Sequence, residues 1–288
     1  MQSTSFLVSD RFLSVGHVAR DEFGEEWRLG GSGLYCAATA ARLGRHATLV
    51  TRVADRERPA LETRCAQLEI ALRCFASAST TTFSFSTVDG RRKLRLRARA
   101  PSLRASDIGA LPTDAPVLLG SIVGEHADDL FGVAAGRSLL VAQGELRAFA
   151  PDGAVVPAPW RRADVVLPTL RAAVLSEEDL GGDLSPVSGW SARAPIVITR
   201  GERGASLFRD GKELRVPAFR PTTIVDPTGA GDSFAAGLLV ALDEGQDWDE
   251  ALRFANCVAS FCLEGIATDG LADRARVEAR LQRGERLG

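Results

Sequence analysis

The chain has 288 residues, and its 45% of apolar residues are enough to fill the core of one large α/β domain or of two smaller ones. Lysine and arginine total 35 against 37 aspartates and glutamates, so the charge balance offers no long-range attraction to nucleic acid or to an anionic membrane. A small-molecule partner is therefore expected.

The five cysteines are odd in number and form no CxxC pair, which argues against a disulfide framework and against a zinc site. No apolar run reaches the roughly 18 to 20 residues that span a bilayer, and the first residues, MQSTSFLVSDRF, lack the basic and apolar regions of a signal peptide. We expect a cytoplasmic protein with reduced, mostly buried thiols.

Short apolar segments of strand length recur between helical patterns along the chain. Nearly continuous Val, Ile and Leu content is typical of parallel strands that are covered on both faces, so the alternation predicts an α/β core. The predicted strands are FLSVG (12–16), ATLVTRV (47–53), PVLLGS (116–121), SLLVAQG (138–144) and PIVITRG (195–201).

Three segments repeat small and apolar residues at helical spacing and should pack on this sheet. The first runs from Leu34 to Leu43 and stops at Gly44, and the others cover 233–242 and 248–263. There is no internal repeat, low-complexity tract or clear linker, so we expect one domain over residues 1–288.

The segment TTTFSFSTVDGRRKLRLRARA (80–100) alternates polar and apolar residues on both sides of Asp89-Gly90, which is a strong hairpin signal. We expect an antiparallel flap. Its arginines either form a solvated edge that resists aggregation or help the flap to close over a ligand. They are Arg91, Arg92, Arg95, Arg97 and Arg99.

The stretch DPTGAGDSFAAG (226–237) carries the strongest chemical signal. Gly229, Ala230 and Gly231 allow a tight turn, and the free N–H groups of the following helix point back at that turn, where a phosphate fits. Asp232 lies in the first helical turn, where a carboxylate can take a proton from an attacking hydroxyl, as phosphoryl transfer needs. An ordinary strand-to-helix turn is the alternative. The sequence has no GxxxxGK[ST] and is therefore not a P-loop enzyme.

These residues resemble the ribokinase-like (PfkB) family of carbohydrate kinases, and the resemblance spans nearly the whole chain. In that family the second Asp of the signature is the catalytic base and the GAG backbone forms the anion hole. GGSGLYCAATAARLG (30–44) resembles the N-terminal signature, in which the glycine pair, here Gly30-Gly31, orients the acceptor. The resemblance implies a central, mostly parallel sheet flanked by helices on both faces, and a small β-sheet lid formed by segments about 17–29 and 80–100.

The resemblance also implies an acceptor site. VGHVARDEF places Asp21 where the family has an Asp that binds substrate hydroxyls, and one carboxylate that accepts two vicinal hydroxyls recognises a polyol. Tyr35 stands where many sugar kinases have Asn, so the pocket chemistry should differ from that of ribokinase. GSIVGE and VAQGELR end predicted strands, which makes Glu125 and Arg147 candidates for the pocket; surface ion pairs are the alternative.

ITRGERGASLF (198–208) matches the family's TxGxxG stretch, in which Thr199 and Gly201 approach the nucleotide and Gly204 makes a turn. A simple strand–turn–strand hairpin would give the same pattern. Asn256 falls where family members bring a helix against the adenine, although an Asn whose hydrogen bonds are satisfied on a buried helix fits equally well.

Two cation sites follow from the same resemblance. The family's magnesium-linked NxxE motif corresponds to AVLSEEDL (173–180), where Ser176 and Asp179 replace Asn and Glu; Asp179 can still order Mg²⁺-bound water. The same residues form a capping box, and a frame on Thr169 and Ala172 would lose the motif. Asp226 and Thr228 match positions that in some relatives help to hold a monovalent cation such as K⁺.

The resemblance implies an ATP-dependent, Mg²⁺-requiring kinase that phosphorylates a hydroxyl of a small polyol, either a sugar or a cyclitol. A nucleoside kinase of the same fold and a catalytically weak nucleotide or polyol sensor are the alternatives. Because the alternating edge of the lid can pair with a copy of itself, a homodimer through the lid is expected.

Overall fold

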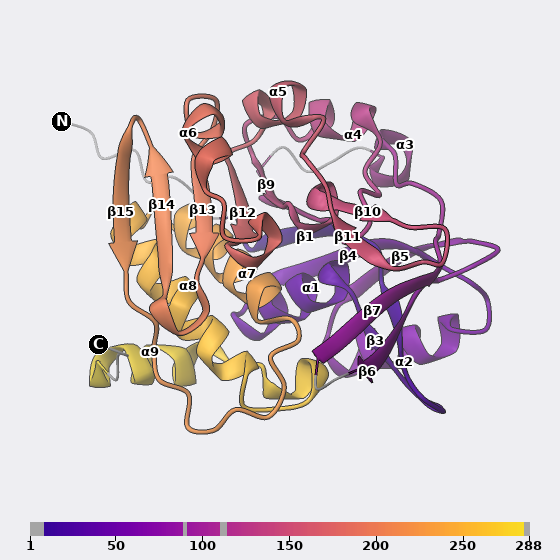
Figure 1. Ribbon diagram of the computed structural model, residues 1–288. Coiled ribbons are helices and arrows are strands. Elements are labelled where there is room, and N and C mark those ends of the chain that lie inside the picture. Colours follow the sequence, from indigo (N-terminus) through magenta and orange to yellow (C-terminus); the bar gives the residue numbers. More distant parts are fainter. Residues whose placement is uncertain (1–8, 89–90, 110–113, 285–288) are drawn as a thin grey trace.

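A computed structural model describes residues 9–88, 91–109 and 114–284 (Figure 1). The predicted turn Asp89-Gly90 lies outside the described residues. None of the described helices is both long and apolar enough to span a membrane.

A nine-stranded sheet forms the centre of the molecule, with strand order β15-β14-β13-β12-β9-β8-β1-β4-β5. All neighbours from β13 to β5 are parallel, whereas β13, β14 and β15 pair antiparallel. The strands are β1 Arg11–Gly16, β4 His46–Val53, β5 Ala71–Ala76, β8 Val117–Gly120, β9 Ser138–Val141, β12 Ala172–Ser176, β13 Ile196–Thr199, β14 Ala205–Arg209 and β15 Lys212–Val216.

Helices cover both faces of this sheet, so the predicted fold class is confirmed (Figure 1). One face packs on α1 Ser32–Arg42, α7 Ala230–Asp243, α8 Trp248–Cys262 and α9 Arg274–Arg283. The other packs on α3 Ala105–Ile108, α4 Asp128–Val133, α5 Ala163–Val166 and α6 Ser185–Ser191. Successive strand residues alternate between the two cores: Leu118 faces α7, and Leu119 faces the opposite layer.

The remaining helical segments are short or lie at the margin of the sheet. The helix α2 Arg58–Gln67 packs beside α1 through Leu61 and Cys65. The 3₁₀ turns are η1 Gln143–Leu146, η2 Leu167–Thr169, η3 Glu178–Leu180, η4 Gly201–Arg203 and η5 Ala267–Gly270.

A separate four-stranded sheet, which we call the lid, has the order β3-β2-β6-β7. Its strands are β2 Ala19–Phe23, β3 Glu26–Gly30, β6 Thr81–Val88 and β7 Arg91–Ala98; β2 and β6 are parallel, and the other pairs are antiparallel. The hairpin β10 Arg147–Phe149 and β11 Val155–Pro157 lies beside β7, because Arg95 bridges to Ala154 and pairs with Asp152.

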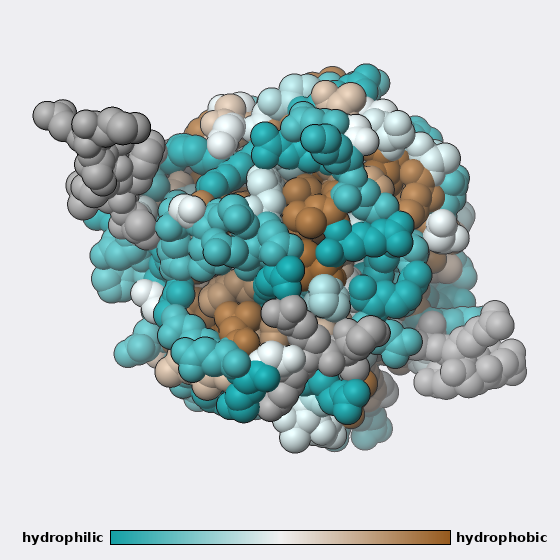
Figure 2. All heavy atoms as spheres, turned by 90° about the vertical axis from the view of Figure 1, so that its left-hand side faces the viewer, coloured by the Kyte–Doolittle hydropathy of each residue, from teal (hydrophilic) through white to brown (hydrophobic). Residues whose placement is uncertain are grey.

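The lid and the outer edge of the central sheet are both amphipathic. Ala19 and Phe83 pack against Ile122 and Val123 of the body, whereas Arg97 on the lid is exposed. Figure 2 views the side of the molecule at β15, and hydrophilic residues cover most of it, with hydrophobic residues in a few separate areas. The edge strand β15 exposes charged residues there, which disfavours pairing with another chain.

Candidate active site

The helix α1 begins directly on the carboxyl ends of two neighbouring strands. A Cβ atom on Gly16 would lie 2.3 Å from the carbonyl oxygen of Gly120, and one on Gly33 would lie 2.5 Å from the carbonyl oxygen of Gly16. Only glycines permit this close packing, which buries Ser32 in the first turn of α1. Ligands of open α/β sheets bind at this edge.

The predicted anion loop lies against α1. Gly229 has a left-handed backbone with φ of 83°, and a Cβ atom there would lie 2.2 Å from the Tyr35 ring. The residue must therefore be glycine for two reasons. The helix α7 begins immediately after it, and the Thr39 and Ser233 hydroxyl groups hydrogen-bond at 3.1 Å between α1 and α7. Because Tyr35 lies in the first turn of α1 and its ring contacts Gly229, the N-termini of α1 and α7 lie close together.

Asp232 lies half-buried in the first turn of α7. Burial raises the pKa of its carboxyl group to about 6, a hydrogen bond with the Ser32 side chain and the charge of Arg147 oppose that shift, and the charge of Asp179 adds to it. A carboxylate with such a pKa is well suited to accept a proton near neutral pH.

Arg147 and Asp179 complete the charged part of the site. Burial lowers the pKa of Arg147, and the negative charges of Asp179 and Asp232 oppose that shift, so both acids act on this guanidinium. Asp179 Oδ2 accepts the backbone N–H of Ser176 at 2.8 Å, and Ser176 Oγ accepts the N–H of Asp179 at 3.0 Å. The capping box is therefore present, and the charge of the same Asp179 carboxylate acts on the site.

The predicted acceptor-side residues lie on the lid and at the start of α1. Asp21 on β2 is buried, and a Cβ atom on Gly30 would lie 2.1 Å from its carboxylate, so glycine leaves room for that group. Gly31 has φ of 90°, and a Cβ atom there would meet the backbone of His17 and Ala19. The glycine pair thus lets the lid strands lie close to α1.

Two predicted pocket residues have their side chains inside the protein. Tyr35 is only 2% exposed and fills the space under Gly229; burial, followed by the charges of Cys262, Asp226, Asp21 and Asp232, raises its pKa. The carboxylates of Asp21 and Asp232 therefore both act on this ring. A contact between Tyr35 and an acceptor stays a prediction.

Glu125 is fully buried, in contrast to the pocket position that its place at a strand end predicts. It accepts hydrogen bonds from the backbone N–H groups of His17 (3.1 Å), Ile122 (2.9 Å) and Val123 (2.9 Å) and from the Ser121 hydroxyl (3.3 Å). Burial would raise its pKa, but His17, His126 and the N–H donors outweigh burial and lower it. These contacts give Glu125 a structural role.

The predicted nucleotide-side residues lie at the ends of β13 and β14 and on α8. Thr199 pairs in register with Ser176 and donates to the carbonyl oxygen of Leu175 at 3.4 Å. Gly201 has φ of 57° in open space, whereas Gly204, with φ of 81°, has no room for a Cβ atom beside the Val216 carbonyl. Asn256 Nδ2 donates to the carbonyl oxygens of Val216 and Pro217. Asn256 therefore holds the segment after β15, and its contact with a nucleotide stays a prediction.

The predicted monovalent cation site has the oxygen donors that such an ion prefers. Asp226 Oδ1 accepts the backbone N–H of Thr228 at 2.9 Å, and the Thr228 hydroxyl oxygen is buried without a hydrogen-bond partner. An unsatisfied buried oxygen beside a carboxylate fits a K⁺ ligand set. Within the described ranges, no three or more His, Cys, Asp or Glu side chains gather closely enough to hold a metal ion by themselves.

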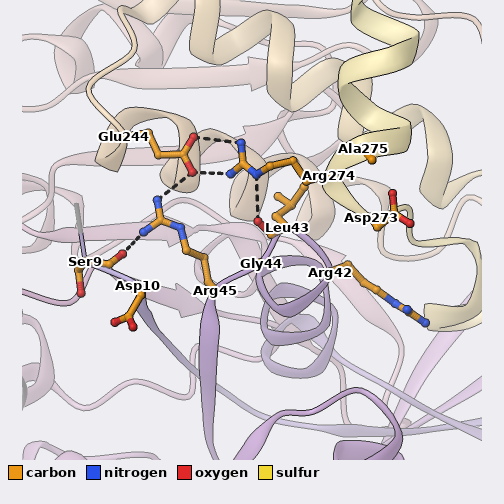
Figure 3. Close-up of a pocket in the computed structure, with 10 residues that line it drawn as sticks. All are labelled: Ser9, Asp10, Arg42, Leu43, Gly44, Arg45, Glu244, Asp273, Arg274 and Ala275. Carbon is orange, nitrogen blue, oxygen red and sulfur yellow. Dashed lines mark hydrogen bonds and ion pairs between the residues drawn. The ribbon is translucent and has the colours of Figure 1, made fainter. Parts of the chain in front are cut away.

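Two surface cavities lie away from these residues. One, of about 530 Å³, is formed between the end of α1 and the start of α9, where Arg45 and Arg274 both turn toward Glu244 (Figure 3). The other, of about 680 Å³, lies between β3, α2 and η5 and includes Trp27 and Ile266. The candidate site is therefore defined by converging residues rather than by either cavity.

Sequence reasoning missed Ser32, which touches Asp232. The available signal was its position directly after the glycine pair, at the first residue of a helix whose N-terminus faces the anion loop. It also did not reveal that Asp179 and Asp232 both act on Arg147.

Residues 164–272 match the model of the pfkB family carbohydrate kinases. The cytidine kinase of Thermococcus kodakarensis is 38% identical over 96 residues, which are 32% of this chain and 34% of that protein. The ribokinase of Bacillus subtilis is 46% identical over 90 residues, which are 31% of this chain and 30% of that protein. The chain thus matches about a third of the length of these curated relatives.

Solved structures match over nearly the whole chain. A pyrophosphate-dependent kinase in the ribokinase family, complexed with a pyrophosphate analog and myo-inositol, superimposes with a TM-score of 0.78 at 21% identity, covering 93% of this chain and 99% of that one. The Burkholderia thailandensis nucleoside kinase in complex with inosine gives 0.75 at 18% identity, covering 96% and 100%. These likenesses show the ribokinase fold, and within it residues 164–272 match the pfkB carbohydrate kinase model.

Proposed function

We propose that the protein transfers the γ-phosphoryl group of ATP to a hydroxyl of a small polyol, either a sugar or a cyclitol, with Mg²⁺. The observation that carries this proposal is the position of Asp232. Its carboxyl group, with a pKa of about 6, lies in the first turn of α7, where Ser32, Arg147 and Asp179 act on it. ATP as donor is supported by the family and by the Arabidopsis thaliana ribokinase structure, which contains ribose and ATP.

In the proposed reaction Asp232 takes the proton of the acceptor hydroxyl as that oxygen attacks the γ-phosphorus and the bond to the β-phosphate oxygen breaks. Backbone N–H groups of Gly229, Ala230 and Gly231 and the guanidinium of Arg147 stabilise the negative charge on the transferring group. Asp21 holds two acceptor hydroxyls on the opposite side. The lid excludes water, which would otherwise compete for the phosphoryl group.

Mg²⁺ usually keeps several water ligands and binds one or two carboxylates together with substrate phosphates. Asp179 is the carboxylate that would hold it here through an ordered water, and its charge acts on Arg147. When bound, the ion would neutralise charge on the donor phosphates. Asp226 and Thr228 would hold K⁺ beside the anion loop, as their unsatisfied oxygen suggests.

The test is phosphorylation of sugars, cyclitols and nucleosides by wild type and by Asp232→Asn, with ATP and with pyrophosphate as donors. We expect turnover of at least one acceptor with ATP, and a loss of about 10² to 10⁴ in kcat for the variant, the usual range for a general base. Asp243→Asn is the matched control, because it removes a half-buried carboxylate at the other end of α7. Near-normal kcat in Asp232→Asn would contradict the role of this residue.

A nucleoside acceptor is the second candidate, and one feature of the lid favours it. The Phe23 and Phe85 rings stack with centroids 4.7 Å apart and 7° between planes, and Arg28 lies over Phe23. Side chains two residues apart on a strand share a face, so Phe23 lies on the face of Asp21. Aromatic side chains stack well on flat rings. Preference for nucleosides over cyclitols in the same panel would select this candidate, and tight binding without turnover would favour a sensor.

Pairing of two copies through the lid also remains a proposal. It is supported by the position of β3 at the edge of the lid sheet. Sedimentation equilibrium of the full chain measures this directly: a monomer mass over the accessible concentration range would contradict a homodimer.

A further inference from the structure

His17 occupies an unusual position between the central sheet and the lid. It follows the last residue of β1 and precedes β2, and its side chain is fully buried. Nε2 lies 3.0 Å from the carbonyl oxygen of Pro101, Nδ1 lies 2.8 Å from the hydroxyl oxygen of Thr81, and its backbone N–H donates to Glu125 Oε1 at 3.1 Å. Both ring nitrogens and the backbone are thus engaged.

The partners fix the tautomer of this ring. A carbonyl oxygen only accepts hydrogen bonds, so the proton of the neutral ring is on Nε2, and Nδ1 accepts from the hydroxyl of Thr81. The Thr81 oxygen in turn accepts the backbone N–H of Ala100 at 3.1 Å. A directed chain of hydrogen bonds therefore runs from Ala100 through Thr81 to His17. Burial lowers the pKa of His17, although the charge of Glu125 opposes that shift, which favours the neutral ring.

This chain of hydrogen bonds joins the two places at which the second lid segment leaves the body. Thr81 is the first residue of β6, and Ala100 and Pro101 follow the end of β7. We call these places the lid stems. The Glu125 carboxylate accepts the backbone N–H groups of Ile122 and Val123 together with that of His17. The turn after β8 and the lid stems are therefore held to one residue.

We propose that His17 is a positioning residue that fixes the lid stems relative to the ends of β1 and β8, and thereby holds Asp21 opposite Asp232. Asp21 lies four residues after His17 on β2, and β2 pairs directly with β6 through Ala19 and Thr81. A displacement at Thr81 is therefore passed to the strand that carries Asp21. The expected effect on catalysis rests on the proposed kinase function. The hydrogen bonds that link His17 to the lid stems do not depend on that function.

The decisive variant is Thr81→Val, which keeps the shape of the side chain and removes the hydroxyl that links Ala100 to His17. Thr82→Val is a matched control, because Thr82 is also buried and its hydroxyl bonds only to the carbonyl oxygen of Thr80 in the same segment. For Thr81→Val we expect an acceptor KM about tenfold higher and a higher ratio of ATP hydrolysed to acceptor phosphorylated. Thr82→Val should leave both values near those of wild type.

Hydrogen–deuterium exchange of the same proteins without substrates provides a readout that does not depend on activity. Thr81→Val should speed exchange of the β6 and β7 amides about tenfold while β8 and β9 stay unchanged, and Thr82→Val should not. His17→Gln keeps one donor and one acceptor and should fall between wild type and His17→Leu. If His17→Leu does not fold, the comparison of Thr81→Val with Thr82→Val tests the proposal instead.

Equal exchange and equal hydrolysis ratios in Thr81→Val and Thr82→Val would overturn the role of His17. If wild type phosphorylates no acceptor, the proposed function fails, and the exchange measurement alone then decides whether His17 holds the lid stems. The two failures are therefore distinguishable.

Discussion

Asp232 lies among charges that act on it in opposite directions. Burial and Asp179 favour its protonated form, whereas Ser32 and Arg147 favour the carboxylate. The result is a pKa of about 6, which leaves the proposed base ionised at neutral pH and still basic enough to take a proton. This balance depends on residues from three separate elements, α1, β10 and η3.

Arg147→Met should shift the acid limb of the pH profile. In wild type, kcat/KM for the acceptor should rise with pH through about 6 and level off above it, because only the ionised Asp232 accepts a proton. Removing the guanidinium raises the pKa of Asp232, so the limb should move to higher pH. The loss of transition-state charge stabilisation should also lower kcat by about 10². The measurement is kcat/KM across the acid, neutral and mildly basic range.

The sign of that shift is the critical outcome. An acid limb that stays in place, or moves to lower pH, would mean that Arg147 does not act on the carboxylate that carries the limb. Arg137→Met, which changes an arginine that donates to the carbonyl oxygen of Ala115 just before β8, is the control for a general effect of losing an arginine.

Single residues with a local signature were predictable, and those defined by distant contacts were not. GAGD predicts the turn at Gly229 and the start of α7, because both are encoded within a few residues. The catalytic role of Asp232 stays a prediction. Glu125 was predicted to line the pocket, but its burial depends on the backbone of His17, 108 positions away in the chain. The contact of Ser32 with Asp232 likewise joins segments that are far apart in the chain, and no periodicity reports it.

At the level of elements, the anion loop is the place where backbone geometry is most restricted. Gly229 combines a left-handed conformation with direct contact to the buried Tyr35 ring. Gly231, two residues later, lies in α7, and a Cβ atom there would meet nothing within 4 Å. The loop geometry therefore requires glycine at position 229 but not at position 231.

Gly229→Ala should destabilise the protein, and Gly231→Ala should not. The left-handed conformation alone costs a residue with a Cβ atom about 1 to 3 kcal/mol, and displacement of Tyr35 adds to that cost. Alanine at 231 instead favours the helix, by up to about 1 kcal/mol. The measurement is the free energy of unfolding in urea for both variants. Equal stability of the two variants would contradict the loop geometry.

Whether a segment forms a helix or a strand could be predicted from the spacing of its apolar residues and from its composition. The residues at which each element ends could not. The segment 138–144 was predicted as one strand, but β9 stops at Val141 and η1 begins at Gln143. The reason is tertiary: a Cβ atom on Gly144 would lie 2.5 Å from Ser121 Oγ, so this glycine packs against the turn after β8. The lid segments were expected from a resemblance and from alternation, but alternation alone does not reveal that β2 pairs with β6.

For the whole molecule, the raised pKa of Asp232 means that the proposed catalytic group reduces stability at neutral pH. The folded protein binds a proton on Asp232 up to about pH 6, whereas the unfolded chain releases it near pH 4. Raising the pH through this window therefore removes stability, because the folded state loses its more tightly held proton.

Asp232→Asn should consequently be more stable than wild type at mildly basic pH, by about 1 kcal/mol for a side chain that is only half-buried. The difference should shrink as the pH falls from about 6 to about 4, where wild-type Asp232 is protonated in both states. Thermal unfolding of both proteins above and below this window checks the prediction. A difference that grows toward low pH would have the wrong sign.

The attachment of the lid has a consequence for how such a protein can diversify. Gly30 pairs with Ala19, Ala19 pairs with Thr81, and the adjacent Thr82 pairs with Ala98, so both lid segments join the body side by side. The segment that matches the family model, 164–272, contains none of these residues. The lid can therefore change in sequence while the segment that carries the family match stays the same.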